Sequence, residues 1–170
     1  MRIKTDYDGL EILSSVHNNV PDNDGARMIF TILSGENLSK ILDINKAELI
    51  RYIPEIGKMI GYNQNNPNLH LDLWNHTLVA LENSVNNFEV RMALLLHDIS
   101  KPDCCVVKDD RSYYPGHNKK SSEMAREILT RLGWDGEIVN TICDIIAVHD
   151  KPLTQEFAKN NFELSKKRNI

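Results

Sequence analysis

This 170-residue chain has few cysteines and few aromatic residues. It also has no excess of positive charge and no long apolar run. The three cysteines, Cys104, Cys105 and Cys143, form no Cys-x-x-Cys pair, and adjacent cysteines rarely meet disulfide geometry. We therefore expect reduced thiols rather than a disulfide framework or a zinc ribbon. No apolar run approaches the roughly 18 residues of a membrane span, and the N-terminal residues lack the apolar stretch of a signal peptide. These absences predict a cytoplasmic protein without a membrane segment.

The charge balance argues against a protein that binds nucleic acid by charge alone. The formal net charge is −4 and aromatic residues make up only 6%, so neither an electrostatic nor a stacking platform for RNA is favoured. The remaining composition, 41% hydrophobic and 26% charged, is that of an ordinary globular domain. A chain of this length can bury its own core, so we expect a bound metal to serve chemistry rather than folding.

Apolar residues recur mostly at helical spacing. The segment 88–99 is apolar almost all round, which is typical of a central, buried helix. Segments 61–69 and 101–116 read as loops, the second with a possible extended piece at 104–107. We predict an all-α fold in one domain, with a short helical N-terminal segment (1–60) packed on a core (70–152). The expected helices are 24–33, 46–52, 71–85, 88–99, 121–132 and 135 to about 149.

Histidine and aspartate residues stand at the ends of several expected helices. Asp98 directly follows the apolar run LLLH, and aspartate is rarely buried unless it is paired or bound to a metal. Neighbouring His97 and Asp98 differ by about 100° around a helix, so only a helix end could turn both toward one ion. Imidazole and carboxylate together suit first-row divalent metals, which can polarise a phosphoryl oxygen. The other residues of this set are His76, His117, His149 and Asp150.

The order of these residues resembles that of the HD superfamily of metal-dependent phosphohydrolases. The blocks that carry the likeness are GYNQNNPNLHLDLWNHTLVAL, RMALLLHDISKP, YYPGHNKKSSEMAREILTRL and IIAVHD. Over about residues 50–150 they resemble the HD region of bacterial tRNA nucleotidyltransferases, and residues 8–50 resemble more weakly the helical segment before it. The catalytic head of those enzymes has no counterpart in the first 70 residues, so nucleotidyl transfer is not expected.

This resemblance implies a set of site residues. His76, His97 and Asp98 would hold one metal, and His117 and His149 would bind a second. Asp150 would stand in for the final aspartate of the superfamily, with Asp144, Glu156 and Glu163 as weaker substitutes. Lys101 would offset phosphate charge, and His70 and Gln64 would order a loop or touch the substrate edge. The chain departs from the family pattern at Ser100 and Ser121, where the family usually has glycine.

The sequence therefore predicts a phosphomonoesterase or cyclic phosphodiesterase that acts on a nucleotide or another small phosphate ester. A metal-bound hydroxide would attack phosphorus, with Asp98 and Lys101 at the catalytic centre. The cofactor would be one or two divalent ions, of Fe, Mn, Ni, Co, Zn or Mg. The alternative is a catalytically weak module that binds RNA, a nucleotide or a protein partner. The oligomeric state stays open.

Overall fold

The computed structural model describes residues 19–151, and within that range it is all-α apart from one small hairpin. Three short helices come first: α2 (Asp24–Leu33), α3 (Leu38–Ile44) and α4 (Lys46–Tyr52), followed by the 3-10 helix η1 (Pro54–Lys58). The later helices are α5 (Leu73–Glu82), α6 (Phe88–Leu96), α7 (Lys101–Cys104), α8 (His117–Arg131) and α9 (Gly136–Val148). No helix among the described residues is long and apolar enough to cross a bilayer.

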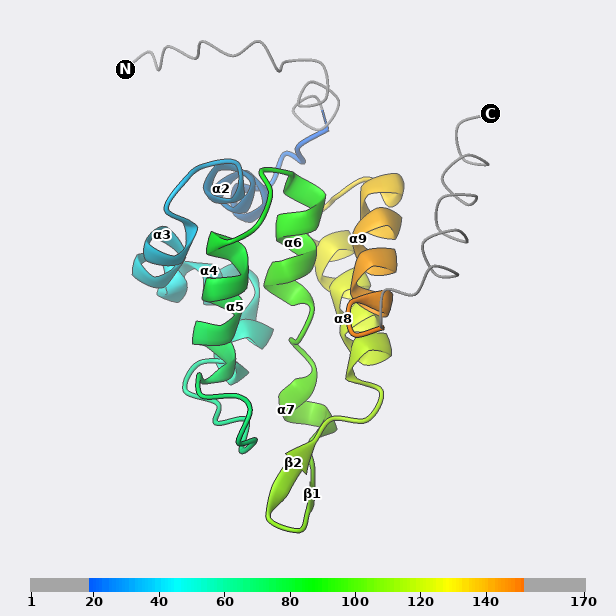
Figure 1. The fold of residues 1–170 in the computed structure, drawn as a ribbon. Helices are drawn as coiled ribbons and strands as arrows, with labels where there is room; N and C mark the ends of the chain where they lie inside the picture. Colours follow the sequence, from blue (N-terminus) through cyan, green and yellow to red (C-terminus); the bar gives the residue numbers. More distant parts are fainter. Residues whose placement is uncertain (1–18, 152–170) are drawn as a thin grey trace.

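Side-chain caps begin several of these helices. Asn23, Asp72, Asn87 and Asp135 each accept a hydrogen bond from a backbone N–H in the first turn of the helix that follows. Gly133 ends α8 with a φ of 87°, a left-handed conformation that glycine adopts without a steric penalty. Short connections make α5 antiparallel to α6 and α8 antiparallel to α9 (Figure 1).

Helix α6 is the centre of the bundle. It packs against α5 on one side and α9 on the other, and α8 packs along α9 (Figure 1). Met92, Leu95 and Leu96 of α6 are completely buried, as expected for a helix that is apolar almost all round. Phe30 and Trp134 pack against Phe88 with ring centroids 5.1 and 4.7 Å apart, which joins α2 and the α8–α9 turn to the start of α6.

Three local predictions differ from the structure. Helix α3 was not expected; Leu38 and Leu42 are its buried residues, and this one-turn spacing in so short a segment is a weak signal. The segment 101–116 is not a loop. It contains α7 and an antiparallel hairpin of β1 (Val106–Lys108) and β2 (Arg111–Tyr113). Proline is tolerated in the first turn of a helix, and Pro102 lies in the first turn of α7.

The hairpin turn explains why β2 was not predicted. Its two central residues, Asp109 and Asp110, have φ values of 50° and 58°, the conformation that Asn-Gly usually signals. The expected extended piece at 104–107 overlaps β1, while no local pattern indicated β2. The predicted helix 121–132 begins earlier, at His117. Residues 152–170, which include the candidates Glu156 and Glu163, lie outside the described residues.

Candidate metal centre

The topology brings four helix ends to one end of the bundle. Helices α6 and α9 end there, while α5 and α8 begin there, close to the hairpin (Figure 1). His97 is the C-terminal cap of α6, His149 is the C-terminal cap of α9, and His117 is the first residue of α8. His76 lies in the first turn of α5. Residues far apart in sequence therefore meet at this end.

The end of α6 turns His97 and Asp98 toward the same point. Nε2 of His97 lies 3.1 Å from Oδ2 of Asp98, although the two residues are neighbours. Residues 97–100 are a turn rather than a further helical turn, and this releases the two side chains from helical spacing. Asp98 is only 1% exposed. The carboxylate that follows the apolar run is therefore buried in the interior.

Asp98 belongs to two groups of side chains that could each hold a metal ion. The first group is His76, His97 and Asp98, and the second is Asp98, His117 and His149. Nε2 of His76 lies 3.8 Å from Oδ2 of Asp98. On the other side of the carboxylate, Oδ1 lies 3.2 Å from Nε2 of His117 and 3.5 Å from Nε2 of His149. One carboxylate is thus shared, with an oxygen facing each group.

Three of the four imidazole rings are oriented by backbone carbonyls. Nδ1 of His97, His117 and His149 lies 2.7, 2.9 and 2.7 Å, respectively, from the carbonyl oxygen three residues earlier. A carbonyl only accepts, so Nδ1 carries the proton and Nε2 of a neutral ring keeps its lone pair. These backbone contacts leave Nε2 of each ring facing the carboxylate, which is the tautomer that a metal ligand requires.

The donor set fits a divalent cation. Nε2 of His117 and Nε2 of His149 lie 3.3 Å apart, so two lone pairs face each other unless a proton or a cation lies between them. Oδ1 of Asp98 is buried and makes no hydrogen bond within the part of the chain that is described, although two imidazoles lie within 3.5 Å. A buried carboxylate oxygen without a hydrogen bond is costly. A cation between these atoms would satisfy all of them at once.

The ionisation of the cluster reflects the same crowding. Burial alone would raise the pKa of Asp98, but the imidazoles of His117, His149 and His97 outweigh it and hold this pKa far below the ordinary value. Burial lowers the pKa of His76, and nearby Asp98 offsets only part of that effect. Burial would also lower the pKa of His149, yet its contact with Asp98 raises it on balance. A proton on His149 and a bound cation are therefore alternative partners of Asp98.

Lys101 lies inside this cluster. Its Nζ is 2.7 Å from Oδ2 of Asp98 and donates to Oε1 of Gln64 at 3.1 Å. The ammonium also lies 5.4 Å from the centroid of the Tyr114 ring, within the range of a cation–π contact. Gln64 is completely buried, so it faces Lys101 rather than solvent. Tyr114 was missed by sequence reasoning, because no spacing rule links the hairpin to residue 101.

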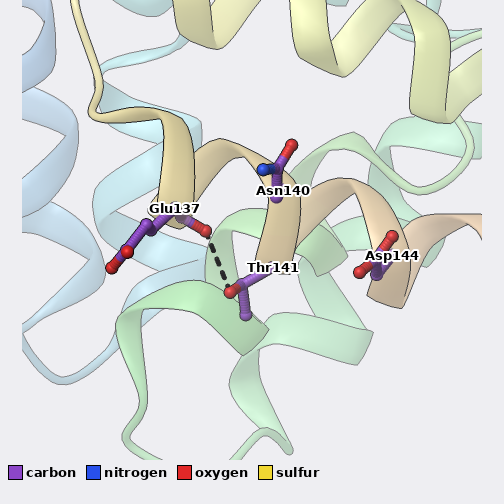
Figure 2. Close-up of a pocket in the computed structure, with 4 residues that line it drawn as sticks. All are labelled: Glu137, Asn140, Thr141 and Asp144. Carbon is purple, nitrogen blue, oxygen red and sulfur yellow. Dashed lines mark hydrogen bonds between the residues drawn. The ribbon is translucent and has the colours of Figure 1, made fainter. Parts of the chain in front are cut away.

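Asp150 and His70, predicted as a metal ligand and as a loop-ordering or substrate-edge residue, lie outside both groups. Asp150 is exposed, and its carboxylate accepts a hydrogen bond from Nδ2 of Asn118 at 3.1 Å rather than joining the imidazoles. His70 is exposed in the loop before α5. The weaker candidate Asp144 lies on the exposed side of α9, where it lines a polar pocket with Glu137, Asn140 and Thr141 (Figure 2). Within the described residues, neither Asp150 nor Asp144 therefore belongs to the two groups that could hold a metal ion.

The two serines at the family's glycine positions touch each other. Ser100 and Ser121 are fully buried, and their hydroxyl oxygens lie 2.9 Å apart. The Ser100 hydroxyl donates to the carbonyl of His117 at 2.8 Å, so its only proton is used and Ser121 must donate to Ser100. The Ser100 N–H in turn donates to Oγ of Ser121 at 3.2 Å. The two serines thus form one closed network beside His117, a member of the second candidate metal group.

The site and fold define a helical protein with a buried carboxylate among four imidazoles, and comparison with known proteins adds weak similarity to tRNA nucleotidyltransferases. The chain is 30% identical over 112 residues to the CC-adding tRNA nucleotidyltransferase of Thermus thermophilus, a match that covers 62% of this chain and 26% of that enzyme. It is 27% identical over 125 residues to the A-adding enzyme of Deinococcus radiodurans, covering 69% and 29% respectively.

The chain thus spans between a quarter and a third of the length of these curated relatives. No family model matches the chain. No solved structure matches it either. The similarity agrees with the resemblance to tRNA nucleotidyltransferases that the sequence blocks indicated. It covers only part of each relative, so it does not assign the activity of those whole enzymes to this chain.

Proposed function

We propose that this protein is an HD-type metal-dependent phosphohydrolase, a phosphomonoesterase or cyclic phosphodiesterase acting on a nucleotide-like phosphate ester. The observation that carries the proposal is the shared carboxylate of Asp98, buried between two imidazole groups with one oxygen lacking a hydrogen bond. Burying this carboxylate destabilises the folded protein unless a cation is bound, so stability alone does not explain the site. The similarity to tRNA nucleotidyltransferases supports an enzyme that handles nucleotides.

The residues would hold one or two divalent ions. His76, His97 and Asp98 would hold one, and Asp98, His117 and His149 would hold the other. A bound ion of this kind polarises a phosphoryl oxygen and acidifies coordinated water. Imidazole-rich ligands with a single carboxylate suit Fe, Mn, Co, Ni or Zn better than Mg, which prefers oxygen ligands.

The protein's own groups would orient the substrate. Lys101 presents an ammonium next to the shared carboxylate, where it would bind a phosphoryl oxygen and stabilise the negative charge that develops there. The side chain of His76 is 35% exposed, whereas those of the other four ligands are at most 19% exposed. A phosphate ester would therefore approach from the His76 side, and the buried side would exclude water.

The experiment is a hydrolysis screen of the purified protein with each candidate metal. Substrates are nucleoside monophosphates, 2′,3′-cyclic nucleotides and a chromogenic phosphomonoester. We expect Asp98→Asn, which keeps the side-chain shape, to lose both bound metal and at least about 100-fold of the activity. Asp144→Asn, one turn before His149 on the exposed side of α9, is the matched control and should retain both. Well-folded protein that turns over no substrate with any metal would refute the proposal.

A binding module for RNA, a nucleotide or a protein is the second candidate, and the tRNA-acting relatives favour its RNA form. The same Asp98→Asn variant separates the two candidates. An RNA-binding module would keep its RNA affinity in this variant, because recognition would not need the buried carboxylate.

A further inference from the structure

We propose that Gln64 is a positioning residue that holds the Lys101 ammonium in place to bind the phosphate of the substrate. The inference rests on the proposed function and deepens it. It differs from the sequence-based expectation for Gln64, which was a contact at the substrate edge or a loop-ordering role.

Gln64 is fixed on three sides by residues from different parts of the chain. Its Oε1 accepts from Nζ of Lys101, its Nε2 donates to the carbonyl of Leu71 at 3.3 Å, and its own backbone carbonyl accepts from the Tyr114 hydroxyl at 2.8 Å. The side chain is completely buried. A buried amide with both ends hydrogen-bonded has one orientation, so its oxygen stays aimed at Lys101.

Lys101 needs such a partner because its stem is long and flexible. A lysine ammonium is a compact charge with three donors on four rotatable carbons, and its direction is not set by its own geometry. In the structure, the ammonium is held by the carboxylate of Asp98, the oxygen of Gln64 and the ring of Tyr114. Each of the three comes from a different segment, so together they define one position.

A cation at Asp98 would change this balance. Oδ2 of Asp98 faces both Lys101 and the group of His76 and His97, so a metal ion there would compete for the oxygen and repel the ammonium. Gln64 is neutral and belongs to neither group of candidate ligands, so its acceptor would remain. Gln64 is therefore the hydrogen-bond acceptor that, together with the Tyr114 ring, keeps Lys101 in the site when the metal is bound.

The alternative is that Gln64 only orders the loop before α5. Neighbouring Asn65 provides the comparison, because its Nδ2 donates to the carbonyl of Asp110 at 3.1 Å and so ties the same loop to the hairpin. Asn65 makes this bond without touching Lys101. A purely loop-ordering role predicts similar consequences for the loss of either side chain, whereas a positioning role predicts a Lys101-dependent effect of Gln64 alone.

The first measurement does not depend on activity. Protein loaded with Mn²⁺ is labelled with an amine reagent, and modification of Lys101 is followed by peptide mass spectrometry. Gln64→Met keeps the side-chain volume and removes the acceptor, so we expect faster labelling of Lys101. Gln64→Glu restores an acceptor and should return the rate toward that of the wild-type protein, and Asn65→Ala should leave it unchanged. Unchanged labelling in folded Gln64→Met protein would overturn the proposal.

The second measurement is the binding of inorganic phosphate to Mn²⁺-loaded protein by calorimetry. We expect Gln64→Met to weaken phosphate binding about tenfold, within the range for partners that orient functional groups. The same change in a Lys101→Met background should have no further effect. Equal losses in both backgrounds would overturn the positioning role. A wild-type protein that neither binds phosphate nor hydrolyses any ester, yet shows the labelling change, would instead refute the proposed function.

Discussion

The Ser100–Ser121 network predicts an unusual result from a double-mutant cycle. Ser121→Ala removes the acceptor of the buried Ser100 N–H and the donor to the Ser100 hydroxyl. A buried polar group left without a partner costs about 1–3 kcal/mol, so we expect about 2 kcal/mol of lost stability. Ser100→Ala leaves the Ser121 hydroxyl without its acceptor, and we expect a loss of about 1–2 kcal/mol for the same reason.

The double variant should not show the sum of these losses. When both hydroxyls are absent, the Ser100 N–H lacks its acceptor and the His117 carbonyl lacks its hydroxyl donor, but no Ser121 hydroxyl is left without a partner. We therefore expect the double variant to lose about 2–2.5 kcal/mol instead of the additive 3–4, which is a coupling of about 1–1.5 kcal/mol. The assay is urea unfolding of metal-free protein, monitored by far-UV circular dichroism. The dependence of the unfolding free energy on urea concentration, m, should be equal in all variants if unfolding is two-state.

Ser122→Ala is the matched control for this cycle. Ser122 lies next to Ser121 on α8, but its hydroxyl donates to the carbonyl of Cys143 at 2.9 Å and has no contact with Ser100. Its effect should add to that of Ser100→Ala. If the Ser100 and Ser121 variants were instead additive to within about 0.3 kcal/mol, the closed network would not exist in the folded protein.

Three further predictions follow from other contacts. Arg91 is buried and donates to two backbone carbonyls at the end of α2, so Arg91→Ala should cost about 3 kcal/mol and Arg91→Lys less; a loss below about 1 kcal/mol for alanine in urea unfolding would contradict this. Burial would raise the pKa of Glu55, but its paired bonds from Arg131 lower it on balance. The stabilisation, under about 1 kcal/mol at this partly exposed position, is present above the ordinary pKa of about 4.3 and is lost as the pH falls below it. Stability curves of Arg131→Met should lack that loss. Finally, elemental analysis of His76→Ala and His149→Ala should each show the loss of one ion of a two-ion site, whereas an unchanged metal content in both would place the metal elsewhere.

The parts of this protein that local rules govern could be predicted from sequence. The end of α6 is one case, since the apolar run before His97 and Asp98 indicated a buried helix whose end carries a carboxylate. Helix α2 matches its predicted bounds because Asn23 caps it and apolar residues repeat along it. In each case the signal lies within a few residues of the structure it specifies.

Contacts across the fold could not be predicted in this way. Gln64 and Lys101 are 37 residues apart, and Gln64 and Tyr114 are 50 residues apart. Their meeting depends on how the loop before α5 packs against the hairpin, which no periodicity encodes. The hairpin itself turns at Asp109 and Asp110 in a conformation that usually calls for Asn-Gly. The sequence therefore predicted the members of the two His and Asp groups better than the residues that position Lys101 beside them.

The charge of the cluster decides what kind of ligand it would favour. Among the residues that converge here, Asp98 contributes one negative charge, Lys101 one positive charge, and neutral imidazoles none. Asp150, which would have added a second carboxylate, bonds instead to Asn118 at the surface. The charge of a divalent ion bound among these residues would therefore stay almost uncompensated by protein, and it would attract an anion strongly in a partly buried site. A phosphate ester supplies that anion, so the lack of a further carboxylate in the cluster, within residues 19–151, supports the proposed phosphate substrate.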